Sequence, residues 1–97
     1  MEVTIYVAPN GAKKTVEIRN VLDEDREFFE SNSVVISMEE IPSSNGVDFV
    51  VYADTGMENE DGDPEEFIEI AGGRSCKEVL HALRLSCEEY FKQRGGQ

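Results

Sequence analysis

Apolar residues occupy every second position in two segments near the start of the chain, residues 2–7 and 13–19. The apolar positions are Val3, Ile5, Val7, Val16 and Ile18. A period of two residues is typical of β-strands that bury one face. Residues 9–11 (Pro-Asn-Gly) between the two segments have turn chemistry, so the pattern predicts a β-hairpin.

The middle of the chain contains further strand-forming segments. Residues 33–39 and 47–54 are rich in β-branched and aromatic residues, which favour strands. Residues 42–46 between them combine Pro, Ser, Asn and Gly, which favour a turn. We therefore expect a second hairpin, followed by a short fifth strand at residues 66–70.

Two segments have helical patterns. Residues 22–31 lack alternation, and Asp23 can cap their first turn, which predicts a short helix. Residues 75–78 (Ser-Cys-Lys-Glu) spell a capping box, and a long helix is expected over residues 76–94. The residues expected to face inward are Leu22, Phe28 and Phe29 in the short helix, and Cys76, Val79, Leu80, Leu83, Cys87, Tyr90 and Phe91 in the long one.

These elements predict one α+β domain that comprises residues 1–97. We expect an antiparallel sheet of about four to five strands, built from two hairpins and a short strand. The short helix and the long C-terminal helix would pack on this sheet. Cys76 and Cys87 would lie about 16 Å apart along the long helix, too far for a disulfide, so we expect both thiols to be reduced.

Charge is distributed unevenly along the chain. The 97 residues carry a formal net charge of −12, from 21 acids against 9 Lys and Arg. Residues 27–73 contain 13 acids and no Lys, Arg or His. This composition argues against direct binding to nucleic acid or to an anionic membrane, and the N-terminal residues suggest neither a signal peptide nor a membrane span. Uncompensated like charge weakens a compact fold, so we expect it to serve solubility, a bound cation or a strongly positive partner.

No recognised catalytic or metal motif accounts for the acids. Six of the ten residues from 57 to 66 are acidic, but an EF-hand register centred on Gly62 places Met57 and Ile68 where carboxylates are required, so the match fails. A weak cation site of another type in residues 57–66 is an open alternative. His81 is expected to be exposed on the long helix without a local partner. With no phosphate loop and no nucleophile signature, we expect no enzyme and no cofactor.

Carboxylates on strands can imitate a phosphate backbone. Residues two apart on a strand project from one face at about 6.6–6.8 Å, and phosphates follow one another every 3.4 Å of rise along each DNA strand. The two spacings are of the same order. A partner that neutralises phosphates with Lys and Arg would therefore bind such a surface as well.

In its length, its base-free residues 27–73 and its acidic residues 57–66, the chain resembles the small acidic DNA-mimic inhibitors of phages and prophages, the anti-CRISPR and anti-restriction proteins. More narrowly, it resembles anti-CRISPR proteins directed at the type I-F (Csy) surveillance complex. The resemblance implies an inhibitor that occupies the PAM-duplex site on the large and tail subunits and excludes target DNA. It also implies action in the cytoplasm of an infected or lysogenic bacterial host. The expected contact residues are Glu39, Glu40, Asp54, Glu58, Glu60, Asp61, Asp63, Glu65 and Glu66.

The alternative is a non-enzymatic acidic interaction module, such as an adaptor or a phage accessory protein, that does not mimic DNA. Its acids would serve solubility, and a hydrophobic patch at Leu85, Tyr52 or Met57 would bind the partner. Salt separates the two hypotheses, because a DNA mimic loses affinity steeply as ionic strength rises and a hydrophobic contact does not.

Overall fold

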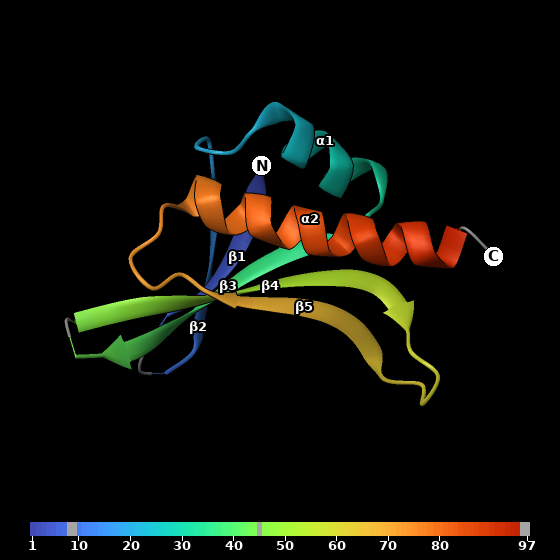
Figure 1. Cartoon of the computed structure of the whole chain (residues 1–97). Helices are drawn as coiled ribbons and strands as arrows, with labels where there is room; N and C mark the ends of the chain where they lie inside the picture. Colours follow the sequence, from blue (N-terminus) through green and yellow to red (C-terminus); the bar gives the residue numbers. More distant parts are fainter. Residues whose placement is uncertain (8–9, 45, 96–97) are drawn as a thin grey trace.

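The computed structural model describes residues 1–7, 10–44 and 46–95. Within these residues, five strands form one sheet, and two helices lie on one face of it (Figure 1). The strands are β1 (Glu2–Val7), β2 (Ala12–Glu17), β3 (Val35–Ser43), β4 (Gly46–Glu58) and β5 (Pro64–Ile70), and the helices are α1 (Asp23–Ser31) and α2 (Cys76–Gly95). The predicted α+β class and the long C-terminal helix on the sheet are confirmed.

The strand order in the sheet is β2-β1-β3-β4-β5. Both hairpins and the β4–β5 pair are antiparallel, as expected, but β1 and β3 run parallel. A parallel neighbour requires a long crossover connection, and here β2 and α1 together supply it. The sheet is therefore mixed, and β1 lies inside it with β2 at the edge.

The second hairpin is longer than its sequence pattern predicts. β3 and β4 pair as far as Ser43 and Gly46, so both strands extend into the turn expected over residues 42–46. Cross-strand pairing extends both strands into residues whose own turn propensity is high, which is a common effect of tertiary context. Position 9 of the first predicted turn and position 45 of the second lie outside the described residues.

The core lies between the sheet and the helices. α2 contacts β4 and β5, and α1 packs on α2. The buried apolar side chains are Val3, Phe29, Val34, Ile36, Met38, Val51, Ala53, Val79, Leu80, Leu83 and Cys87. Both cysteines are free, with Cys76 half-buried and Cys87 buried.

The helix starts differ in their capping. At α2, the Glu78 backbone N–H donates to Ser75 Oγ at 3.2 Å, so the predicted cap by Ser75 is confirmed. The Glu78 carboxylate completes the pair by accepting from the Ser75 hydroxyl at 3.1 Å. At α1, Leu22 occupies the N-cap without a side-chain hydrogen bond, so the prediction that Asp23 caps this helix is wrong. Asp23 is the first helical residue, where its negative charge is favourable near the helix N-terminus.

Candidate functional site

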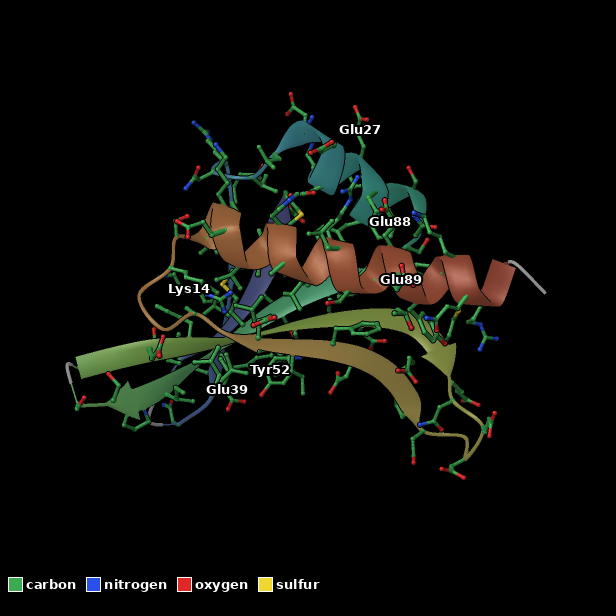
Figure 2. The ribbon with its side chains drawn as sticks, in the orientation of Figure 1. Lys14, Glu27, Glu39, Tyr52, Glu88 and Glu89 are labelled. Carbon is green, nitrogen blue, oxygen red and sulfur yellow. The ribbon has the colours of Figure 1, made fainter. Side chains whose placement is uncertain are left out.

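The helices leave one face of the sheet uncovered, and Glu39 and Tyr52 project from it (Figure 2). We term this surface the open face. Directly opposite residues of neighbouring strands share a face, and the buried residues of each strand point to the helices. The open-face side chains include Lys13 and Thr15 of β2, Thr4 and Tyr6 of β1, Val35, Ser37 and Glu39 of β3, Val50, Tyr52 and Asp54 of β4, and Glu66, Ile68 and Ile70 of β5.

Four neighbouring side chains of β4 and β5 form an apolar strip on the open face. Val50 lies opposite Ile70, and Tyr52 lies opposite Ile68. Ile68 and Ile70 are 54% and 53% exposed. Such aromatic and β-branched pairs stabilise a sheet, but more than half of each Ile surface stays in contact with water. The strip is therefore a surface that a partner could cover.

Carboxylates border the apolar strip. Glu39 lies opposite Val50, and Asp54 and Glu66 lie directly opposite each other beyond Tyr52 and Ile68. Like charges that face each other across a sheet are destabilising. Among the described residues, no basic group forms an ion pair with any of the three carboxylates. The part of the open face formed by β3, β4 and β5 therefore presents negative charge that no ion pair within the described residues neutralises.

The other like-charge pair of the sheet, Glu2 and Glu17 on β1 and β2, is treated differently. The Met1 ammonium lies 2.6 Å from Glu17 Oε1. This hydrogen bond is the main cause that lowers the pKa of Glu17 below its ordinary value. Asp54 and Glu66 have no such cation among the described residues, so no ion pair there relieves the repulsion between them.

Tyr52 links the apolar strip to the acids. Desolvation raises the pKa of the Tyr52 phenol, and the charges of Glu39 and Glu66 raise it further. The phenol is therefore protonated at neutral pH and can donate a hydrogen bond. Both carboxylates therefore lie close enough to the phenol to influence its ionisation.

The ends of β4 and β5 and the turn between them form a second acidic feature, which we term the acidic arm (residues 54–66). Figure 1 shows the two strands curving away from α2 toward the turn. The arm contains no Lys, Arg or His, and its seven acids are Asp54, Glu58, Glu60, Asp61, Asp63, Glu65 and Glu66. At its base, the buried Thr55 donates from Oγ1 to the Glu65 carbonyl oxygen at 2.8 Å, next to a register shift between the strands.

The tip of the acidic arm has a defined backbone conformation. Asn59 Oδ1 accepts hydrogen bonds from the backbone N–H groups of Asp61 at 2.9 Å and of Asp63 at 3.0 Å. Gly62 has a φ of 82°, a conformation that favours glycine. The exposed carboxylates of the tip are therefore carried by a backbone turn of defined conformation.

The structure divides the nine predicted contact residues among three places. Glu39, Asp54 and Glu66 lie on the open face, Glu58, Glu60, Asp61 and Asp63 lie at the arm tip and the adjoining strand end, and Glu40 and Glu65 have the alternation of the helix-covered face. Glu39 and Glu40 also line a hollow of about 450 Å³ beside Tyr6 and Pro42. The nine acids thus do not form the single line of charge that the sequence suggested. Their role as contacts stays a prediction.

One polar cluster was not foreseen. The Asp25 carboxylate is fully buried, and its Oδ2 lies 3.0 Å from His81 Nδ1. Arg84 Nε lies 3.6 Å from Asp25 Oδ1, and the Arg84 guanidinium lies over the Phe28 ring. His81 is half-buried rather than exposed as expected. Its partner is not local in sequence, because Asp25 belongs to α1 and lies 56 residues away.

The same cluster contains the one group of three potential metal ligands among the described residues, Glu24, Asp25 and His81. The Asp25 carboxylate already accepts from His81, and the positive charge of Arg84 beside it opposes a bound cation. We therefore interpret the cluster as a structural link between α1 and α2. The carboxylates of the acidic arm do not gather into such a group within the described residues.

The other hydrophobic candidates are scattered. Leu85 is 48% exposed, but it belongs to α2 and therefore lies on the opposite side of the sheet from Tyr52. Met57 is half-buried within the acidic arm. The sequence singled out Tyr52 without its three neighbours, because only the strand register brings Val50, Ile68 and Ile70 beside it.

Among the described residues, neither helix combines the length and the apolar character that crossing a membrane requires. No family model, curated protein or solved structure matches this chain. The geometry and charge of the open face and the acidic arm are therefore the observations from which a function is proposed.

Proposed function

We propose that this protein is an inhibitor that binds the basic, DNA-binding surface of a protein or ribonucleoprotein complex and keeps DNA out of it. The observation that carries this proposal is the acidic arm, which gathers seven carboxylates without a single base. In its most specific form, the target is a type I-F CRISPR surveillance complex, at the PAM-duplex site of its large and tail subunits. The place of action is the cytoplasm of an infected or lysogenic bacterial host.

The mechanism needs no covalent chemistry. A surface that binds DNA carries Lys and Arg side chains at positions set by the phosphates. The exposed carboxylates of the acidic arm can pair with the same side chains, so inhibitor and DNA compete for one site. The negative field of the arm also accelerates the encounter. Because Asn59 already fixes the backbone of the tip, little ordering remains to be done on binding.

A competition assay with a four-fold charge reversal tests this proposal. The protein should displace a fluorescent PAM-bearing duplex from a purified type I-F complex. Replacing Glu58, Glu60, Asp61 and Asp63 by Lys should abolish displacement. The control reverses four exposed acids outside the arm, Glu2, Glu27, Glu30 and Glu89, and should retain displacement, although both variants have the same net charge.

Two results would contradict the proposal. One is unchanged displacement by the arm variant, and the other is equal loss in both variants, since this would mean that net charge alone matters. Single Ala substitutions in the arm should have small effects, because each exposed ion pair contributes at most about 1 kcal/mol.

A second candidate function is an acidic interaction module that does not mimic DNA. The apolar strip favours it, because a pure charge mimic has no use for two exposed Ile side chains. Salt separates the two candidates. Affinity that stays constant as ionic strength rises, without competition from duplex DNA, would favour the module.

A further inference from the structure

We propose that the apolar strip is the centre of the contact with the partner, and that the partner surface presents a hydrophobic centre surrounded by Lys and Arg side chains. This inference rests on the proposed function and specifies the kind of DNA-binding surface that the protein would select. It concerns the open face, whereas the charge-reversal experiment concerns the tip of the acidic arm.

The first argument is the position of the strip in the sheet. β5 is an edge strand, and exposed aliphatic side chains on an edge strand invite aggregation. Ile68 and Ile70 nevertheless expose more than half of their surface there. On the helix-covered side, in contrast, Val3, Ile36 and Val51 are buried. A surface that is costly to leave open is best explained by a partner that covers it.

The second argument is the charge around the strip. Glu39 lies on one side of it, and the Asp54–Glu66 pair lies at its end. These three carboxylates have no basic partner in the described part of the chain. Lys or Arg side chains of a partner would relieve the repulsion within the pair while the apolar surfaces meet. The same negative charge disfavours nucleic acid and a second copy of this chain as the occupant.

The third argument concerns selectivity. Phosphate mimicry alone would make the protein bind every DNA-binding surface, because contacts to phosphates carry little sequence or shape information. Protein interfaces commonly place apolar and aromatic anchors at the centre and polar groups at the rim. The arrangement of Tyr52 and the two Ile residues inside a border of acids matches this pattern. The strip would thus provide selectivity that charge cannot provide.

The test compares two double variants on the purified type I-F complex as the probe. The strip variant Ile68→Thr/Ile70→Thr keeps β-branched residues on β5. The control variant Val47→Thr/Leu85→Gln changes two other exposed apolar residues, which are 56% and 48% exposed and lie outside the open face. Circular dichroism and thermal unfolding first establish that both variants fold like the wild type.

We expect the strip variant to weaken binding about tenfold at low and at high salt, because it removes buried apolar area from the contact. The control variant should bind like the wild type. Glu66→Gln should weaken binding at low salt only, because salt screens its contribution. Together these results would distinguish the contribution of the apolar centre to binding from that of its charged rim.

Wild-type affinity of the strip variant would overturn the inference, and the acids would then serve to protect an edge strand from aggregation. If the four-fold charge reversal still abolished displacement, the proposed function would stand without the inference about the apolar strip. Equal weakening by the control variant would also overturn the inference. Sedimentation could also contradict the inference, if the wild type formed a dimer and the strip variant were a monomer, because the strip would then be the contact between two copies of this chain. Failure of the wild type to bind the complex at any salt concentration would remove the proposed function and this inference together.

Discussion

The fully buried Asp25 carboxylate lies between α1 and α2, where it meets His81 at 3.0 Å and Arg84 at 3.6 Å. A buried ion pair adds little net stability over apolar packing, but the loss of one partner leaves the other charge without compensation. The Arg84 side chain is 17% exposed, so water can solvate it only in part. The junction of the two helices therefore depends on Asp25.

We predict that Asp25→Ala lowers the free energy of unfolding by about 3 kcal/mol. The substitution removes the buried acceptor that faces His81 and Arg84, and it leaves Arg84 with Glu88, at 3.4 Å, as its counterion. Urea unfolding at neutral pH measures this change. Asp23→Ala is the matched control on the same helix, since its side chain is 82% exposed, and it should cost no more than about 0.5 kcal/mol. Similar effects of the two substitutions would contradict the assigned role of Asp25.

Cys87 predicts a pH dependence of stability. Burial raises the pKa of this thiol from 9.0 to about 11. The unfolded chain therefore releases the thiol proton first as pH rises, so the stabilisation is complete below about pH 9 and is lost on approaching pH 11. We expect the free energy of unfolding to fall by roughly 2 kcal/mol across this window.

Cys87→Ala serves as the reference for this pH profile. It loses packing at every pH, but it should lack the part of the alkaline decline that the thiol causes. Urea unfolding at pH 8, 9, 10 and 11 compares the two proteins. Parallel profiles for wild type and variant would show that Cys87 does not ionise as described.

At the scale of elements, strands and helices could be predicted where a local signal exists. The first hairpin follows from alternation, and the start of α2 follows from the Ser75–Glu78 box, which the structure confirms. The parallel β1–β3 pair has no local signal, because it depends on where α1 packs. The burial of Asp25 was also not predictable, since Asp25 is one of three consecutive acids in the first turn of α1. Only the packing of α1 in the tertiary fold determines which of the three is buried.

Asn59 predicts how the arm tip responds to substitution. Asn59→Ala removes the acceptor of two backbone hydrogen bonds, each of which contributes about 1 kcal/mol. We expect amide hydrogen exchange at Asp61 and Asp63 to become about fivefold faster or more, with little change in global stability. Glu60→Ala is the control, because its exposed side chain holds no part of the turn. Unchanged exchange in Asn59→Ala would contradict a fixed tip.

The whole molecule is electrostatically divided. β3, β4 and β5 belong to the base-free part of the chain, and the bases lie in β2, in the helices and in their flanking segments. The uneven charge could be predicted from the sequence, but its division between an open face and an arm could not. That division depends on strand register, which assigns Glu39 and Glu40 to opposite faces.

Self-repulsion within the acidic half predicts a salt-dependent stability. The Debye length falls from about 30 Å in 0.01 M salt to about 3 Å in 1 M salt. When NaCl is raised from about 0.01 M to about 1 M, we expect the Tm to rise by about 5 °C. For a domain of this size, this rise corresponds to an increase in the free energy of unfolding of roughly 1 kcal/mol. Differential scanning calorimetry measures it. Glu60→Gln/Asp61→Asn/Asp63→Asn should reduce the rise, and an equal rise in this variant would contradict the explanation.

The mixed sheet has a consequence for the order of folding. β3, β4 and β5 follow one another as an antiparallel meander, so their pairing closes only short loops. The parallel contact of β1 with β3 joins Thr4 to Ser37 and closes a much longer loop. Because contacts of low sequence separation form faster, we expect the meander to assemble first and the N-terminal hairpin to dock last. The surface proposed to bind the partner is thus the early-folding part of the chain.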